Sequence, residues 1–184
     1  MKHSLYLLLL SLVCCGLSAG TIMTVLGPID SKELGQTLEH EHILVDFVGA
    51  EDTGNHRWDQ ENVLEAVLPY LLEAKALGFK SIVECTPAYL GRDPRLLKSL
   101  SEKTGLHLIT NTGYYGAREN KFIPVDVQKL SANDLASRWI EEFENGIEDT
   151  RIKPGFIKIG VDRDTRHSWK SDSSSQTWTL DLYR

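Results

Sequence analysis

The sequence predicts an α/β fold built from parallel strand–helix units. Short apolar, β-rich segments alternate with longer segments that carry apolar residues at helical spacing, and four such strands fall within residues 35–161. Strands connected in this way pair in parallel, as an eight-stranded barrel or an open doubly wound sheet. Glycine fingerprints of the dinucleotide and P-loop kinds are missing after the first strand, so the doubly wound alternative loses its best support. We place this domain at residues 21–162.

The first unit combines an extended segment with a helix. The partly apolar sequence GQTLEHEHILVDF, residues 35–47, is the expected first strand, and a polar loop follows it. We expect the helix to have Asp59 as its cap, Gly78 as its end and a kink at Pro69. Its apolar stripe consists of Val63, Val67, Leu71, Ala74 and Leu77.

The second unit begins with FKSIVECT, residues 79–86, which is short and apolar, as a strand buried on both faces should be. Asp93 and Pro94 are the expected cap and first residue of the next helix, and Gly105 is its expected end. The apolar stripe of this helix consists of Leu96, Leu97 and Leu100.

The third and fourth strands are LHLITNT, residues 106–112, and GFIKIGV, residues 155–161. Between them, Ser131 and Asp134 form a capping box in the sequence, and Gly146 is the expected helix end. The apolar face of this helix consists of Leu135, Trp139 and Phe143.

The first 20 residues have the layout of a secretory signal peptide. A cationic start at Lys2 precedes an apolar run, and small residues occupy positions 18–20. The run is about half of the roughly 20 residues that a spanning helix needs, so we expect cleavage rather than stable membrane insertion. We therefore predict export to the periplasm or the extracellular space. The alternative is a strand or helix of the core at the N-terminus.

The last segment, residues 163–184, is polar, serine-rich and without an apolar stripe at either period. A fourth barrel helix is not encoded there. We expect a disordered or adventitious tail, and a short functional segment is the alternative.

Composition limits the class of protein and of partner. The chain has 184 residues with 41% hydrophobic and 25% charged residues, which is typical of an ordinary globular protein. Its formal charge is −6, and it has no clustered excess of lysine and arginine. We therefore expect no nucleic-acid partner.

Cys85 is the only thiol that remains once the leader is removed, so no internal disulfide can form. It lies in an apolar strand segment. We expect a buried, inert thiol rather than a nucleophile.

Two histidines form the first candidate metal site. His40 and His42 are two residues apart, so both imidazoles point to one side if the segment is extended, and they can share a metal ion. Taken alone, such spacing also arises by accident. In an eight-stranded barrel, however, active-site residues project from the carboxyl ends of the strands, which is where this pair lies.

Lys158 lies within the apolar run of the fourth strand, where an unpaired ammonium is costly to bury. A salt bridge, or a lysine that reaches solvent from the strand end, would remove this cost. The other interpretation is covalent, because a desolvated neutral amine can take up carbon dioxide. The resulting carbamate is an anion that can bridge two cations.

Four segments together resemble the phosphotriesterase family of the amidohydrolase superfamily, in order and at appropriate separations. They are TLEHEHI, the GRD of LGRDPRLL, NTGYY and NGIEDTRIKPGFIKIGV, of which the last is the most specific. The resemblance covers residues 24–162. It implies a (β/α)8 TIM barrel, of which this chain carries the four N-terminal βα units.

The resemblance also implies the site and its chemistry. His40 and His42 would hold one of two divalent metal ions, usually zinc, and Lys158 as its carbamate would bridge both. Tyr115 falls where the family places an aromatic residue against the substrate, and Tyr114 is its neighbour; packing or exposed-loop roles are equally open for both. Two metals activate a water and polarise a phosphoryl or carbonyl oxygen, so the implied reaction is hydrolysis of a small-molecule phosphotriester or lactone.

The departure from the family pattern is equally informative. Family members take two further histidines and an aspartate from later strands, which this chain lacks, so we expect a truncated barrel with an incomplete site and little activity. His167 lies in the unpatterned tail and is no substitute. The alternative function is a non-catalytic half-barrel that forms a homodimer or binds a ligand through its open face.

Overall fold

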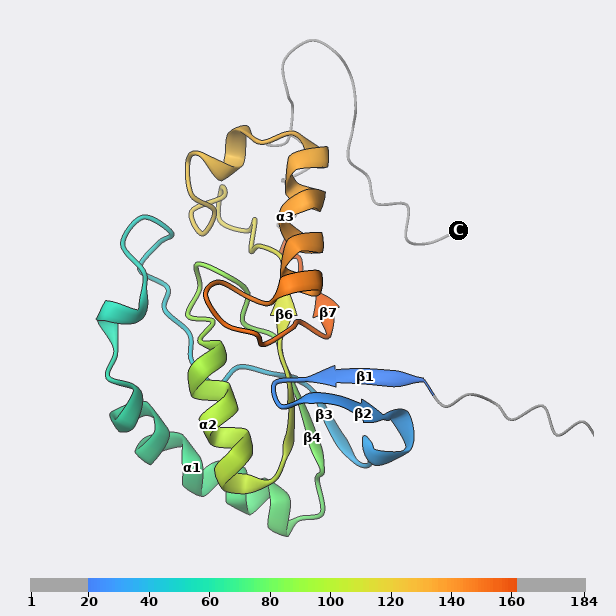
Figure 1. Cartoon of the computed structure of the whole chain (residues 1–184). Helices are drawn as coiled ribbons and strands as arrows, with labels where there is room; N and C mark the ends of the chain where they lie inside the picture. Colours follow the sequence, from blue (N-terminus) through green and yellow to red (C-terminus); the bar gives the residue numbers. More distant parts are fainter. Residues whose placement is uncertain (1–19, 162–184) are drawn as a thin grey trace, which may run out of the picture.

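The computed structural model describes residues 20–161, from a short N-terminal hairpin to the fourth predicted strand (Figure 1). The predicted tail and all but the last residue of the predicted leader lie outside the described residues. In chain order the elements are β1 Thr21–Thr24, β2 Gly27–Asp30, η1 Ser31–Glu33, β3 Thr37–Glu41, η2 Asn55–Arg57, α1 Gln60–Ala76, β4 Ser81–Glu84, α2 Pro94–Thr104, β5 His107–Ile109, β6 Asn111–Thr112, η3 Val127–Lys129, α3 Ala132–Asn145 and β7 Phe156–Ile157.

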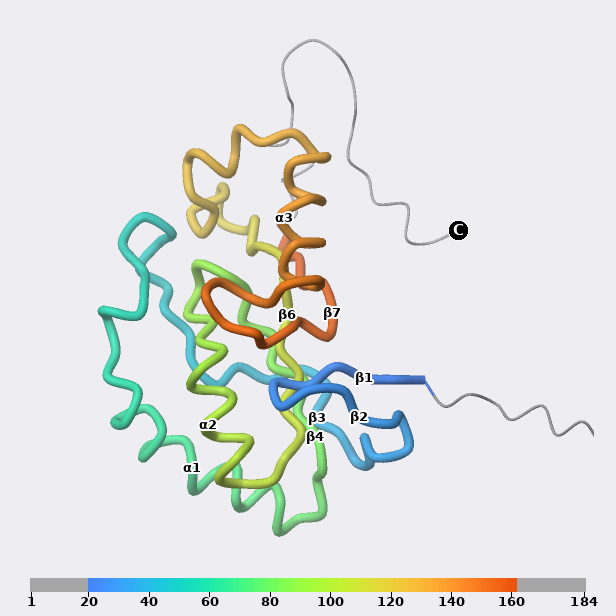
Figure 2. The backbone as a smooth tube through the Cα atoms, viewed as in Figure 1, coloured from blue at the N-terminus to red at the C-terminus, as the bar shows by residue number. Residues whose placement is uncertain are grey.

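The predicted strands pair in parallel and in chain order. β3 pairs with β4, β4 pairs with β5, and β6 pairs with β7, all parallel. β6 follows β5 after the single residue Thr110, so the carboxyl ends of the strands lie toward one end of the molecule. α1 and α2 are in contact and run beside the strands in both views (Figure 1, Figure 2). The structure thus confirms a mixed α/β fold with parallel strand pairing.

The helix boundaries agree with the capping residues expected from the sequence. The side chain of Asp59 accepts a hydrogen bond from the backbone N–H of the third residue of α1, and Asp93 does the same for α2. α2 ends at Gly105, whose φ of 68° lies in the left-handed region that glycine adopts without strain. Ser131 and Asp134 form the expected capping box at the start of α3.

The core lies between the helices and the β3–β4–β5 sheet. Its buried members are Val25, Leu64, Leu71, Ile82, Leu96, Leu97, Leu100, Leu106, Leu108 and Ile152. These residues include members of each apolar stripe expected for α1 and α2. Burial of such side chains removes roughly 1.5–3 kcal/mol of unfavourable hydration each, so this cluster holds the helices against the strands.

The N-terminal hairpin was not expected from the sequence. β1 and β2 pair antiparallel, and the turn between them inserts Val25 into the core, where its N–H donates to the carbonyl of Leu108 (N···O 2.9 Å). Thr24 closes the turn, because its hydroxyl donates to the carbonyl of Gly27. The hairpin therefore anchors the start of the described chain to β5.

β3 is shorter than the predicted first strand and irregular near its end. Its register against β4 shifts between Leu38 and Glu41, so that two residues face one on the partner strand. Such a bulge re-aims the side chains next to it. Here it includes His40, one of the two candidate metal ligands.

None of the helices in the described part of the chain is long and apolar enough to cross a membrane.

Candidate metal centre

Three candidate metal ligands meet at the carboxyl ends of the parallel strands. His40 lies near the end of β3, His42 follows that strand directly, and Lys158 follows β7. The imidazole rings of the two histidines are edge-on, with centroids 5.3 Å apart. The Nζ atom of Lys158 lies 3.4 Å from Nε2 of His40, although 118 residues separate the two in the chain. The fold therefore brings together the two segments that sequence reasoning singled out separately.

Lys158 has no carboxylate partner within residues 20–161. Its side chain is half-buried and its amine lies against the imidazole of His40. Its backbone is fixed, because its N–H donates to the carbonyl of Thr112 at 2.7 Å. A salt bridge of Lys158, which the sequence left open, is therefore not found in the part of the chain that the structure describes.

His42 is tied to the neighbouring strand. Its Nδ1 atom lies 3.0 Å from the hydroxyl oxygen of Thr86, just after the end of β4. Burial lowers the pKa of His42, and the adjacent His40 and Lys158 lower it further. A lowered pKa keeps the imidazole neutral, which is the form that binds metal ions.

Behind Thr86 lies a buried carboxyl group that sequence reasoning missed. Glu84 is 1% exposed, and its carboxylate accepts hydrogen bonds from the hydroxyl of Thr86 (2.5 Å), the N–H of Thr86 (3.2 Å) and the N–H of Ile43 (3.3 Å). Burial raises the pKa of Glu84 to about 7, although these hydrogen bonds oppose the shift. A charge within an apolar run was the signal that identified Lys158, and the same signal is present in SIVECT.

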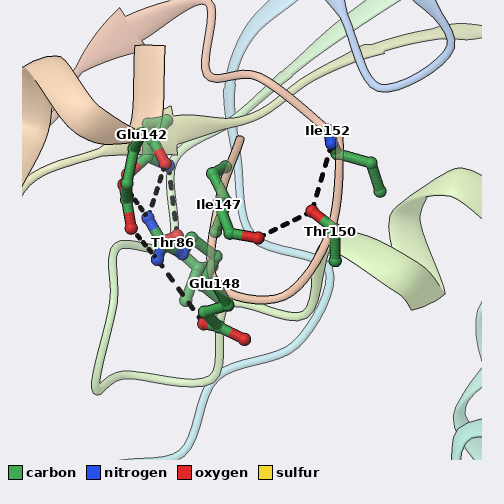
Figure 3. A network of polar contacts seen from close by, with 8 residues as sticks. Thr86, Glu142, Ile147, Glu148, Thr150 and Ile152 are labelled. Atoms are coloured by element: carbon green, nitrogen blue, oxygen red, sulfur yellow. Dashed lines mark hydrogen bonds and ion pairs between the residues drawn. The ribbon is translucent and has the colours of Figure 1, made fainter. Parts of the chain in front are cut away.

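A second buried network holds the strand ends to α3. The guanidinium of Arg92, from the GRD segment, donates to both carboxylate oxygens of Glu142 at 2.8 and 3.0 Å, and it also contacts Glu148 (Figure 3). The same guanidinium donates to the carbonyl of Asn111 at 2.9 Å. Bidentate pairs of this kind fix orientation as well as distance. Arg92 thus locks β6 to the helix that follows it.

Asn111 connects this network to the carboxyl end of β4. Its side-chain amide donates to the carbonyls of Glu84 (3.0 Å) and Thr86 (3.1 Å), and it is fully buried. The segment that carries Glu84 and Thr86 is therefore held from its neighbouring strand.

The two candidate substrate tyrosines lie just beyond β6. Tyr114 packs on the apolar side of α3, with its ring 5.8 Å from that of Trp139, and it belongs to the cluster around Val127 and Leu135. The backbone of Tyr115 forms an isolated parallel β-bridge with Gly160, two residues after Lys158. The ring of Tyr115 lies 5.7 Å from that of Phe122. Tyr115 thus lies beside the strand of Lys158, whereas Tyr114 has a packing role.

Cys85 is 4% exposed, as expected for a structural thiol. Burial raises its pKa, which disfavours the thiolate that a nucleophile requires. The structure therefore gives no support to a cysteine nucleophile.

The donor set fits part of a metal centre. Two imidazoles suit zinc and related ions, and a lysine without a carboxylate partner offers an amine that can become a bridging carbamate. Within residues 20–161, no group of three or more His, Cys, Asp and Glu side chains could hold a metal ion. The described residues thus form no complete metal site from these side chains.

Comparison with known proteins gives the family of the chain. The profile of the phosphotriesterase family matches residues 20–169. Among curated relatives, the aryldialkylphosphatase of Saccharolobus solfataricus is 31% identical over 134 residues, which are 73% of this chain and 42% of the relative. The N-acetyltaurine hydrolase of Rattus norvegicus is 31% identical over 166 residues, covering 76% of this chain and 47% of the relative.

A solved structure shows the same likeness in three dimensions. The resiniferatoxin-binding protein from Rhodobacter sphaeroides superposes with a TM-score of 0.68 at 29% identity, over 82% of this chain and 49% of that one. The chain therefore spans less than half the length of the relatives it matches. Because the family profile covers most of the sequence, the chain belongs to the phosphotriesterase family.

Proposed function

We propose that this chain contributes the first four βα units of a (β/α)8 hydrolase. The hydrolase uses two divalent metal ions, of which zinc is the expected kind, to hydrolyse a phosphotriester or a lactone. The observation that carries the proposal is the approach of Lys158 Nζ to within 3.4 Å of His40 Nε2 at the carboxyl ends of the strands. In barrel enzymes, catalytic groups occupy this end.

The ligand roles follow from the chemistry of the side chains. His40 and His42 would hold one cation through neutral imidazole nitrogens. The amine of Lys158 would lose a proton and bond to carbon dioxide, so that the carbamate oxygens bridge two cations. A pair of divalent cations supplies water activation near neutral pH and polarises the phosphoryl or carbonyl oxygen.

The relatives support a hydrolase of small molecules and do not select its substrate class. One relative is named for hydrolysis of an aryl dialkyl phosphate and another for hydrolysis of an N-acyl compound. Phosphotriesters and lactones both present a polarised oxygen to a metal pair. We propose that Tyr115, which lies beside Gly160 near Lys158, contacts such a substrate.

Zinc binding tests the ligand assignment. Calorimetric titration of the metal-free chain should show that His40→Ala and Lys158→Ala each weaken binding by about 10-fold or more. The matched control is His56→Ala, because His56 is an exposed histidine of η2 outside the centre, and this variant should bind zinc like the unaltered chain. Equal affinity in all four proteins would contradict the assignment.

We further propose that this chain has little turnover by itself, because its described residues provide only part of the ligand set. Assays with paraoxon and with a lactone, with and without zinc, should show rates close to the metal blank. Robust turnover by the purified monomer would overturn this part of the proposal.

A second candidate function is a non-catalytic half-barrel that forms a homodimer. The observation that favours it is an exposed apolar row along and just after β7, formed by Ile157, Ile159 and Val161. Light scattering of the metal-free chain measures its mass, and a stable dimer with cooperative melting would favour this candidate.

Export to the periplasm or the extracellular space is also part of the proposal, because the first 20 residues have the layout of a secretory signal peptide. Zinc would then be acquired after secretion. N-terminal sequencing of the secreted protein should find cleavage within residues 18–20. Retention of the full N-terminus in the cytosol would contradict export.

A further inference from the structure

A chain of hydrogen bonds runs from the buried carboxylate of Glu84 to the imidazole of His42. The hydroxyl of Thr86 lies between them, 2.5 Å from Glu84 Oε1 and 3.0 Å from His42 Nδ1. Glu84 is the last residue of β4 and Thr86 lies just after it, whereas His42 directly follows the adjacent parallel strand β3. This series of hydrogen bonds ends at His42, a residue of the candidate metal centre.

The direction of these hydrogen bonds follows from counting protons. A threonine hydroxyl has one proton to donate and can accept through its lone pairs. The carboxylate of Glu84 already accepts two backbone N–H groups, from Ile43 and Thr86, and at mildly alkaline pH, above its pKa of about 7, it is ionised and can only accept. The hydroxyl proton of Thr86 therefore points to Glu84, and its oxygen is left to accept from His42.

This acceptor selects one form of the imidazole. A neutral imidazole carries its proton on one ring nitrogen and a lone pair on the other. If Thr86 accepts, the proton of His42 is on Nδ1, and the lone pair is on Nε2, the nitrogen that points away from Thr86. Imidazole in water favours the opposite form, with the proton on Nε2.

Burial makes this selection effective. Thr86 is fully buried and Glu84 is 1% exposed, so bulk water does not compete for the hydroxyl proton. Asn111 holds the carbonyls of both residues from β6, which fixes the hydroxyl in place. If the hydroxyl of Thr86 donated to His42 instead, a lone pair of Glu84 would lose its donor in a buried environment, which is costly.

We propose that Glu84, acting through Thr86, fixes His42 in the Nδ1–H tautomer and thereby presents its Nε2 lone pair to a divalent cation. Glu84 and Thr86 are positioning residues, since neither needs to touch the cation or the substrate. The cation in this statement rests on the proposed function, whereas the tautomer is a property of the metal-free chain. The two parts can therefore fail separately.

The tautomer can be measured directly. In the full metal-free chain labelled with nitrogen-15 at histidine, two-bond proton–nitrogen correlations at mildly alkaline pH distinguish a protonated from an unprotonated ring nitrogen. We expect His42 to have a protonated Nδ1 and an unprotonated Nε2. The opposite pattern in the unaltered chain would overturn the proposal without any substitution.

A pair of matched variants isolates the hydroxyl. Thr86→Val keeps the shape of the side chain and removes the hydroxyl, so the His42 signals should move to the Nε2–H pattern that water favours. Thr86→Ser keeps the hydroxyl and should preserve the Nδ1–H pattern. His56, the exposed histidine of η2 outside the centre, serves as the internal reference in both variants. An Nδ1–H pattern that persists in Thr86→Val would overturn the role of Thr86.

Zinc affinity tests the second half of the proposal. Loss of an outer-shell partner of a metal-binding histidine typically weakens metal binding about 10- to 100-fold. We expect a weakening of that size for Thr86→Val and less than about 3-fold for Thr86→Ser. A change of tautomer with unchanged zinc affinity would overturn the cation role of His42 and, with it, the ligand assignment. Zinc binding by an unaltered chain that has the Nε2–H form would overturn the positioning role alone.

Discussion

Two ionisable side chains lie within apolar strand segments, and the fold treats them differently. Glu84 is satisfied by hydrogen bonds from Thr86 and Ile43 and remains buried. Lys158 is half-buried, and among residues 20–161 its side chain meets an imidazole rather than an acid. The first arrangement holds a strand end in place, whereas the second leaves an amine beside an imidazole at the carboxyl ends of the strands.

The sequence predicted the candidate ligands better than the residues that support them. His40, His42 and Lys158 could be found because strand periodicity and an isolated charge are local signals. The links from His42 to Thr86 and from Asn111 to Glu84 depend on how neighbouring strands align. That alignment includes an irregular register in β3, which no local pattern encodes.

The buried carboxyl of Glu84 should make stability depend on pH. Its pKa is raised from 4.5 to about 7, so the folded state favours the protonated form. The contribution of protonated Glu84 to the free energy of unfolding is therefore complete below pH 4.5 and is lost as pH rises through about 7. This contribution is on the order of 3 kcal/mol. The side chain of Glu84→Gln stays neutral at every pH. The free energy of unfolding of this variant should therefore rise relative to that of the unaltered chain as pH increases across this window.

Denaturant unfolding of the metal-free proteins over this pH range measures the effect. Most other titrating groups cancel in the difference between the two proteins; the charge that acts on Glu84 is that of Arg92. A difference that does not vary with pH would show that Glu84 titrates normally in the folded state.

At the scale of elements, the helices were predicted closely and the strands less so. Helix ends depend on caps such as Asp59, Asp93 and Gly105, which lie within a few residues of the helix they bound. Strand ends depend on partners from elsewhere in the chain, so the expected strand at residues 35–47 is reduced to Thr37–Glu41. The N-terminal hairpin escaped prediction because its four-residue strands carry no extended periodic pattern.

The two aspartate caps should differ in their effect on stability. Asp59 is exposed and caps α1 through one backbone N–H, so Asp59→Ala should cost about 1 kcal/mol. Asp93 is 3% exposed and also accepts hydrogen bonds from the side chains of Trp58 (3.0 Å) and Gln60 (2.8 Å), which lie at the start of α1. Asp93→Ala should therefore cost on the order of 3 kcal/mol.

Chemical denaturation at one pH compares the two variants, with each unfolding curve measured in the same buffer. Asp93→Asn retains a side-chain acceptor and should lie between the unaltered chain and Asp93→Ala. Equal losses for Asp59→Ala and Asp93→Ala would mean that the contacts to Trp58 and Gln60 contribute nothing.

The approach of β7 to β6 depends on a missing side chain. Gly113 has a φ of 113°, and a Cβ atom at this position would collide with the backbone carbonyl of Lys158. Gly113→Ala should therefore destabilise the chain by about 1–3 kcal/mol and displace Lys158 from His40. Gly27→Ala is the matched control, because Gly27 also has a positive φ, of 115°, but a Cβ atom there would meet no other atom within 4 Å.

Thermal unfolding gives the loss of stability, and the imidazole signals of His40 report the displacement of Lys158. The signals should shift in Gly113→Ala and stay unchanged in Gly27→Ala. A Gly113→Ala variant with unaltered His40 signals would show that the strand tolerates the side chain without moving the amine.

At the scale of the whole molecule, the two parallel sheets, β3–β4–β5 and β6–β7, have edge strands that lack a partner on one side. β3 pairs only with β4, and β7 pairs only with β6, within residues 20–161. Unpaired strands template further pairing with another chain. The exposed apolar row of Ile157, Ile159 and Val161 lies on the β7 side, so association through this side would both pair a strand and cover apolar surface.

Charges placed in this row should prevent association. Val161 is 71% exposed and Ile157 is 50% exposed, so the double variant Ile157→Lys and Val161→Lys adds two like charges to the surface with little effect on the core. Light scattering over a range of concentrations should show a monomer for this variant and a larger mass for the unaltered chain. Leu77→Lys, at the end of α1 and 69% exposed, is the matched control and should keep the larger mass. If the unaltered chain is itself monomeric at all concentrations, the row along β7 is not a contact between copies of this chain; if Leu77→Lys also dissociates, added charge rather than its position explains the result.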